Sequence, residues 1–179
     1  MARLTVLILF LLIPALAAAD DRPRAGLLWN ASGLPATFPL QVGTPPGRDH
    51  VVHVIDPDSG NPVMAGYIRG GEFFRMLVPP GRWRLRFAHG RGWQGEAGLF
   101  GPGTEWTDME QVLDFRTIGR DRRRAYIVTL TEENGRVNIV GADPRMECQM
   151  ILRDDPGDWP VERPAWRLPG FRIYKRFCG

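Results

Sequence analysis

The fold is decided by the stretch RWRLRFA at residues 82–88. In it Trp83, Leu85 and Phe87 alternate with three arginines, so that apolar and charged side chains recur with a period of two. This alternation is typical of a β-strand that has one buried and one solvated face. We expect the aromatic side to face a core. The arginine side should be in water, paired with acidic residues of a neighbouring strand.

Further strands are predicted on both sides of this one, with turn-forming residues between them. The clearest turns are DPDSGNP at residues 56–62 and the Asn134-Gly135 pair. Regularly spaced short strands of this kind predict an all-β fold, an antiparallel β-sandwich of about seven to nine short strands over residues 37–142. Residues 106–116 fit either a strand or a short helix, and residues 20–36 are predicted to form an irregular N-terminal arm.

Residues 1–19 are interpreted as a signal peptide. Arg3 supplies positive charge, residues 4–16 are almost wholly apolar, and Ala17-Ala18-Ala19 provides a small-residue cleavage site. An uncleaved membrane anchor is the alternative, but a spanning helix needs roughly 20 apolar residues and this run is shorter. We therefore expect cleavage after Ala19 and a periplasmic or secreted mature protein without a transmembrane segment.

The last part of the chain, residues 143–179, differs in composition from the predicted sandwich. Prolines recur along it, which predicts an extended Pro-rich C-terminal tail that wraps the sandwich, with residues 171–177 as an added edge strand. Cys148 and Cys178 are the two cysteines of the chain. In an oxidising compartment two cysteines predict one disulfide, which would pin the tail and remove both thiols as nucleophiles or metal ligands.

A set of short motifs between residues 54 and 115 carries a resemblance to known domains. The motifs are IRGGE at residues 68–72, VPPG at residues 78–81, WQGE at residues 93–96 and LFGP at residues 99–102. With them the chain resembles a small, uncharacterised family of exported bacterial β-sandwich domains. More loosely, it is similar to the prealbumin-like and PEGA-type modules of cell-envelope proteins. The resemblance implies an accessory or binding domain, and it supplies no catalytic residue.

Signatures of catalysis and metal binding are weak. Ser59 lies in a turn and lacks the surroundings of a catalytic serine. His50 and His53 are predicted on opposite faces of a strand, where they cannot chelate one ion together. A composite site that also uses His89 stays open, but surface or core histidines are the simpler interpretation. The sequence DPD at residues 56–58 does not continue into a calcium-binding loop, and we expect no metal and no cofactor.

Four acidic residues lie close together in the sequence: Glu96, Glu105, Asp108 and Glu110. Two carboxyl groups across a cleft can hydrolyse a glycosidic bond. A small carboxylate-dependent glycan hydrolase is therefore one alternative function. A solvated acidic surface is the simpler interpretation of the cluster.

The Gly-rich stretch from residue 91 to residue 106 is the candidate binding region, and its candidate residues are Trp93, Glu96, Phe100, Thr104 and Trp106. Tryptophan offers a flat apolar face to a peptide or a sugar, and glycine lets a ligand approach the backbone closely. The structural alternative is that Trp93 and Phe100 plug one end of the sandwich.

The charge of the chain narrows the choice of partner. The formal net charge is only +3, which is too small an excess to predict nucleic-acid binding. The run Arg122-Arg123-Arg124 is most simply a solvated hairpin tip, with contact to an anionic envelope surface as the alternative. The leading hypothesis is an exported, non-enzymatic accessory or binding module of the bacterial cell envelope, which recognises a protein or polymer partner through loops at one end. A structural envelope subunit that docks by a strand edge is a further alternative.

Overall fold

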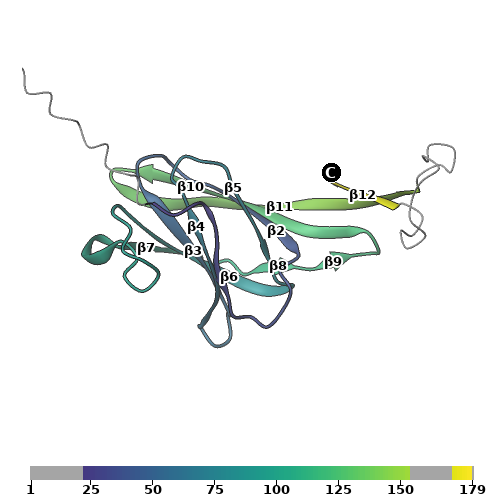
Figure 1. The fold of residues 1–179 in the computed structure, drawn as a ribbon, viewed down its shortest axis with the longest axis horizontal. Helices are drawn as coiled ribbons and strands as arrows, with labels where there is room; N and C mark the ends of the chain where they lie inside the picture. Colours follow the sequence, from purple (N-terminus) through teal and green to yellow (C-terminus); the bar gives the residue numbers. More distant parts are fainter. Residues whose placement is uncertain (1–21, 154–170, 179) are drawn as a thin grey trace, which may run out of the picture.

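The computed structural model of the chain describes residues 22–153 and 171–178, which form two packed β-sheets (Figure 1). Sheet A has the strand order β1 (Gly26–Asn30), β4 (Pro62–Ile68), β3 (Asp49–Ile55), β6 (Gly81–Gly90) and β7 (Glu105–Asp108), and β8 (Leu113–Phe115) also pairs with β6. Sheet B has the order β12 (Phe171–Phe177), β11 (Arg136–Arg153), β10 (Arg122–Glu133), β2 (Phe38–Gly43) and β5 (Phe74–Val78), and β9 (Thr117–Ile118) also pairs with β10. The predicted all-β sandwich is confirmed, with twelve strands among the described residues rather than the smaller number expected.

Strand β6 contains the stretch that decides the fold, and its two faces behave as the alternation predicts. Leu85 and Phe87 are fully buried and face sheet B. On the opposite face, Nε of Arg86 lies 3.1 Å from a carboxylate oxygen of Asp108 on β7. The arginine face is therefore wet and partnered by a neighbouring acid, as expected for a strand with one buried side.

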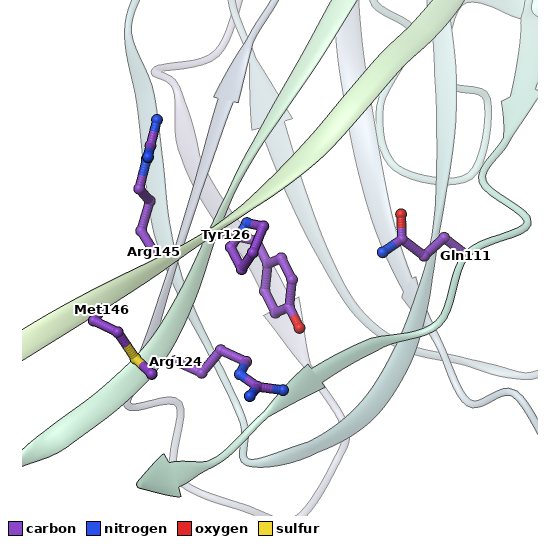
Figure 2. Close-up of a pocket in the computed structure, with 6 residues that line it drawn as sticks. Gln111, Arg124, Tyr126, Arg145 and Met146 are labelled. Atoms are coloured by element: carbon purple, nitrogen blue, oxygen red, sulfur yellow. The ribbon is translucent and has the colours of Figure 1, made fainter. Parts of the chain in front are cut away.

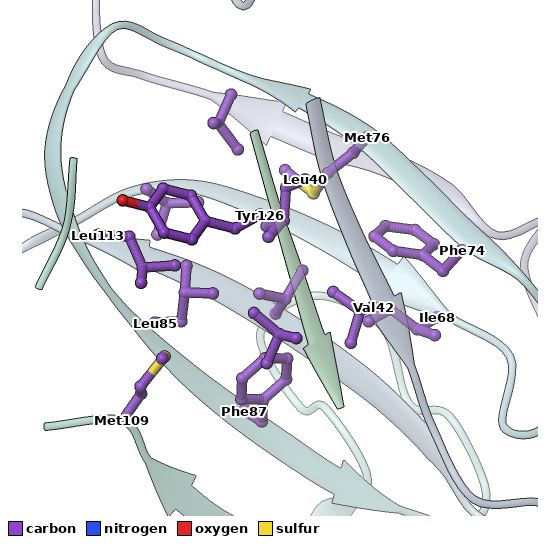
Figure 3. Packing of buried hydrophobic residues seen from close by; sticks show 14 of the residues in the cluster. Leu40, Val42, Ile68, Phe74, Met76, Leu85, Phe87, Met109, Leu113 and Tyr126 are labelled. Carbon is purple, nitrogen blue, oxygen red and sulfur yellow. The ribbon is translucent and has the colours of Figure 1, made fainter. Parts of the chain in front are cut away.

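The hydrophobic core lies between the inner faces of the two sheets (Figure 3). Both sheets contribute side chains to it, and so does the segment after β7, through Met109. The largest contributors labelled in the close-up are Leu40, Val42, Ile68, Phe74, Met76, Leu85, Phe87, Met109, Leu113 and Tyr126. Removal of this apolar surface from water is the main stabilising contribution to the fold.

The sheets are not purely antiparallel, because β2 pairs with β10 in parallel, with Tyr126 opposite Leu40 and Thr129 opposite Gly43. The other strand pairs are antiparallel. A parallel neighbour needs a long crossover connection. Between β2 and β10 the chain forms five strands of sheet A, β3, β4, β6, β7 and β8, which ties the two sheets into one unit.

One local prediction was wrong because the composition of a short strand hid it, and one open alternative is decided in favour of strands. The N-terminal arm contains β1, which pairs with β4 from Gly26 opposite Tyr67 to Asn30 opposite Met64. Its sequence, GLLWN, has no apolar and polar alternation, so no strand signal marked it. Residues 106–116 contain β7 and β8 rather than a helix, and between them the Met109 amide donates to the Leu85 carbonyl at 2.9 Å.

The domain boundary predicted at residue 143 lies inside a single strand. The residues after the Asn134-Gly135 turn belong to β11, which runs for 18 residues and passes through Pro144. The amide of Cys178 donates to the Met146 carbonyl, so the backbone of Met146 faces away from β10, and by alternation so does that of Pro144. Proline is tolerated at such an open strand edge because no partner strand requires its missing N–H.

The C-terminal segment pairs with β11 instead of wrapping the sandwich. In Figure 1, β11 extends beyond the two packed sheets and β12 returns alongside it. The register runs from Arg153 opposite Phe171 to Glu147 opposite Phe177. The edge strand predicted at residues 171–177 is thus confirmed. The predicted course of residues 154–170 and the signal peptide at residues 1–19 lie outside the described residues.

A disulfide joins Cys148 of β11 to Cys178, with the two Cα atoms 5.8 Å apart. It confirms the predicted pairing and fixes the end of β12 to β11. A disulfide is compatible with an oxidising compartment outside the cytoplasm. Among the helices of the described part of the chain, none is long and apolar enough to cross a bilayer.

Candidate binding site

The loop between β6 and β7 begins with an aromatic cluster on the outer face of sheet A. The ring of Trp93 meets Tyr67 edge-on at 4.9 Å between centroids and Phe100 at 5.7 Å. Phe100 is almost completely buried and packs with Val51 and Ala88. Trp93 and Phe100 therefore have a packing role, which agrees with the structural alternative. They cover the outer face of sheet A, however, and do not plug the end of the sandwich.

Thr104 and Glu96 occupy different positions in the same loop. The hydroxyl of Thr104 accepts from the Phe100 amide at 3.1 Å and donates to the Gly101 carbonyl at 2.8 Å, which closes the short 3-10 turn at Gly101–Gly103. Glu96 lies in the preceding turn and is exposed. Thr104 thus shapes the loop, whereas the Glu96 carboxylate remains open to solvent.

Trp106 is the predicted binding residue that stays accessible, with 42% of its surface exposed. It lies on β7, which has β6 as its neighbour on one side and an open edge on the other. The guanidinium of Arg86 lies over the indole at 4.3 Å from the ring centroid, and the His53 ring is 5.5 Å away. Since Arg86 also contacts Asp108, the indole is held in place by a partnered cation.

Two grooves open beside Trp106 and share Glu105 as a lining residue. One, of about 360 Å³, lies between β7 and the start of β11 and is lined by His89, Glu105, Trp106, Thr107, Arg136, Val137 and Asn138. The other, of about 270 Å³, is lined by Arg48, Gly90, Arg91, Gly103 and Glu105. We call the group formed by Arg48, His89, Arg91, Glu105, Trp106 and Arg136 the β7 site.

Electrostatic contacts hold the β7 site together. Arg48 contacts Glu105 at 2.9 Å and Glu132 at 3.6 Å, and it donates to the Gly135 carbonyl at 3.1 Å. Arg91 donates to the Gly47 carbonyl at 2.9 Å. These bonds join the loop before β3 to β7 and to the tip of the β10–β11 hairpin. The site is thereby built from segments far apart in the sequence, which is why sequence patterns missed Arg48 and Arg136.

The carboxylates proposed for a glycan hydrolase do not form a facing pair at β7. Glu105 and Asp108 are three residues apart on one strand, so they point to opposite faces of sheet A. Each lies against a different arginine, Glu105 against Arg48 and Asp108 against Arg86. A glycosidase needs two carboxyl groups directed at the same bond, one of them able to carry a proton. Glu105 and Asp108 are not directed at one bond in this way.

The histidines lie as their spacing predicts, with one addition. His50 faces the interior, and His53 lies on the outer face beside Trp106. The addition is His89, which lies directly opposite His50 across the β3–β6 pair and is also buried. Burial lowers the pKa of His50 to about 4, with the neighbouring His89 as the next cause. Among the described residues, no group of three or more histidine, cysteine or acidic side chains is placed to hold a metal ion.

A further cavity, of about 420 Å³, lies beside β10 and β11 (Figure 2). It is lined by Gln111, Arg124, Tyr126, Pro144, Arg145 and Met146. Two of its polar groups already have partners: the Tyr126 hydroxyl accepts from the Asp114 amide at 3.2 Å, and Arg124 contacts the Asp114 carboxylate at 3.5 Å. In Figure 2 the Arg145 side chain extends away from Tyr126. Tyr126 and Arg124 are therefore already engaged within the fold.

The arginine run at residues 122–124 begins strand β10 directly after the turn of the β9–β10 hairpin, and Arg122 is exposed there. Arg123 donates to the Thr37 carbonyl at 3.0 Å and Arg124 contacts Asp114, so both are half-buried. The run is therefore next to a hairpin turn, as predicted, but two of its three arginines are engaged by neighbouring segments.

Comparison with family models, curated proteins and solved structures finds no match to this chain. The resemblance to exported bacterial sandwich domains stays a prediction that depends on the motifs quoted above.

Proposed function

We propose that the protein is an exported, non-enzymatic binding module of the bacterial cell envelope, which recognises a protein or polymer partner through the β7 site. The observation that carries this proposal is Trp106. It is a large aromatic side chain, 42% exposed, on a strand with an open edge, and it lines a groove. Exposed tryptophans that are held in place are frequent centres of binding energy in protein interfaces.

The neighbours of Trp106 indicate what the partner looks like. The exposed part of the indole suits an apolar side chain or the flat face of a sugar ring. Arg91 and Arg136 line the two grooves and are exposed, and their guanidinium groups suit carboxylates on the partner. The partner class that fits is a peptide or glycan chain that carries both an apolar face and acidic groups.

Three observations support the non-enzymatic and exported parts of the proposal. Glu105 and Asp108 are each neutralised by an arginine on opposite faces of sheet A. Ser59 uses its hydroxyl to donate to the Asp56 carboxylate within a turn. The disulfide between Cys148 and Cys178 supports an oxidising destination, which agrees with a cleaved leader at residues 1–19.

The test is site-specific photo-cross-linking of the protein in its native envelope. A photoreactive amino acid at Asn138, which lines the groove beside Trp106, should capture one recurrent partner. Trp106→Ala should lower the yield of that cross-link by about tenfold or more, as the loss of a central interface aromatic does. Phe73→Ala is the matched control, because Phe73 is also aromatic and is 77% exposed in the segment before β5.

The proposal is overturned if the cross-links at Asn138 are scattered over many proteins and polymers. It is equally overturned if a recurrent cross-link survives Trp106→Ala with an unchanged yield. Loss with Phe73→Ala instead would place the interface on another part of the molecule.

A further inference from the structure

The buried histidine pair His50 and His89 has polar atoms that the fold leaves without partners. His50 is fully buried and His89 is 2% exposed. Among the described residues, no hydrogen-bond partner is found for either ring nitrogen of His50 or for the Nδ1 atom of His89. Buried polar atoms are nearly always paired, and unpaired ones cost stability unless a water or an ion satisfies them. Three such atoms on two neighbouring rings therefore suggest that a water molecule or an ion binds there.

The hydrogen bonds around His89 fix which of its nitrogens is free. The Thr107 hydroxyl donates its single proton to the Val137 carbonyl at 3.0 Å. In its 3.1 Å contact with Nε2 of His89, the hydroxyl must therefore accept, so Nε2 carries the proton. The Nδ1 atom of His89 is then a bare lone pair. A hydrogen bond that fixes the tautomer of a histidine in this way is the usual support of a metal ligand.

The two rings are placed to share one small guest. His50 and His89 are directly opposite each other on β3 and β6, and their ring centroids are 5.8 Å apart. Burial keeps the imidazole of His50 neutral, because its pKa is about 4. Two neutral imidazoles at this separation can each direct a nitrogen lone pair at one ion.

The surroundings select the charge of that ion. The nearby carboxylates are already used: Asp49 accepts from the Tyr67 hydroxyl and the Gly70 amide, and Glu105 contacts Arg48. Divalent zinc or copper would need three or four ligands and would place two uncompensated charges in the protein interior. A monovalent d10 ion that accepts two nitrogen ligands in line needs no further ligand and brings half the charge, and imidazole is a good ligand for copper.

We propose that His50 and His89 form a two-nitrogen binding site for Cu(I), with Thr107 as the residue that positions His89. His89 lines the groove between β7 and β11, which gives the ion a route from solvent. The two histidines lie on the inner face of sheet A, whereas Trp106 lies on the outer face. His89 is the residue that this site shares with the groove of the β7 site.

The test is transfer of Cu(I) from its bicinchoninate complex to the purified, disulfide-intact protein under nitrogen. Wild-type protein should take up one equivalent of Cu(I). His50→Gln and His89→Gln should abolish this uptake, and Thr107→Val should weaken it by about tenfold. His53→Gln is the matched control and should bind like wild type, because the chain has three histidines and this one lies on the other face.

A measurement on unaltered protein guards against variants that fail to fold. In protein labelled with ¹⁵N at histidine, silver(I), used as a redox-inert probe, should shift the side-chain nitrogens of His50 and His89 and leave those of His53 unchanged. The proposal is overturned if these nitrogens do not move, since the guest is then water. It is also overturned if Cu(I) uptake survives both His50→Gln and His89→Gln or disappears with His53→Gln.

Discussion

Trp93 and Trp106 belong to one short stretch of sequence, yet the structure gives them opposite tasks. Trp93 packs edge-on against Tyr67 and Phe100, and the loop that carries it closes over the outer face of sheet A. Trp106 follows on β7, where it remains 42% exposed and is held by Arg86. The difference arises from what lies beside each residue in the sheet, not from the residue type.

The loop at residues 91–104 is held against sheet A, whereas the adjacent Trp106 stays accessible to a partner. Gly90 has no side chain, and a Cβ added there would lie only 2.5 Å from the Cβ of Phe100. Phe100 can therefore pack directly against the backbone of β6 at Gly90, and this contact holds the loop from residue 91 to 104 on sheet A. A rigid loop next to an exposed aromatic residue reduces the ordering cost of binding.

The largest expected effect is a difference in the free energy of unfolding between a variant at Phe100 and a variant at Trp106. Phe100→Ala should lower the free energy of unfolding by about 3–5 kcal/mol, because it removes a buried aromatic side chain and leaves a cavity. Trp106→Ala should cost less than about 1 kcal/mol, because much of its surface is already in water. Urea denaturation followed by circular dichroism measures both. Similar losses for the two variants would mean that the distinction between a packed and an exposed half is wrong.

Much of the fold could be predicted because local patterns and global packing agree. The alternation at residues 82–88, the Asn134-Gly135 turn and the pairing of Cys148 with Cys178 each have a direct physical signature. Strand β1 and the long course of β11 could not be predicted. Strand β1 has no alternation, and Pro144 reads as a strand breaker unless one knows that its N–H side faces an open edge.

The candidate site was predictable only in part, for a related reason. A sequence shows that Trp93, Phe100 and Trp106 are near one another along the chain, but not that the first two pack in one cluster with Tyr67 of β4. Arg48 and Arg136 join Trp106 through turns and strand edges that come from distant segments. Likewise, the pairing of His50 with His89 depends on the register of β3 and β6, which no local motif encodes.

The contrast between a packed face and an exposed face can also be tested with the pH dependence of stability, because His50 lies on the inner face of sheet A and His53 on the outer face. Because the folded-state pKa of His50, about 4, lies below its ordinary value of 6.5, the folded protein resists protonation of this ring. The stability it contributes is complete above about pH 6.5 and is lost as the pH falls toward 4, a loss of up to about 3 kcal/mol. Urea denaturation at a series of pH values between 7 and 4 measures it.

Variants of the two histidines test whether the loss of stability at low pH comes mainly from the His50 ring. His50→Gln should remove the largest share of the pH dependence. His53→Gln should remove less, although burial lowers the pKa of His53 as well, because that ring lies on the outer face beside Trp106. Equal flattening of the pH profile by the two variants would contradict the assignment of His50 to the interior face.

The smallest expected effect tests whether Trp106 is held in place rather than merely exposed. In a double-mutant cycle of Arg86→Met and Trp106→Leu, the coupling energy should be about 0.5–1 kcal/mol, since the guanidinium lies 4.3 Å from the indole centroid at an exposed site. Arg84→Met is the matched control. Arg84 lies on the same face of β6 but donates to the Pro57 carbonyl, so its coupling to Trp106 should be near zero. Equal coupling for the two arginines would show that no specific stack restrains the indole. The difference between Trp93 and Trp106 would then be one of exposure alone, and the argument that β7 presents a preordered binding residue would lose its support.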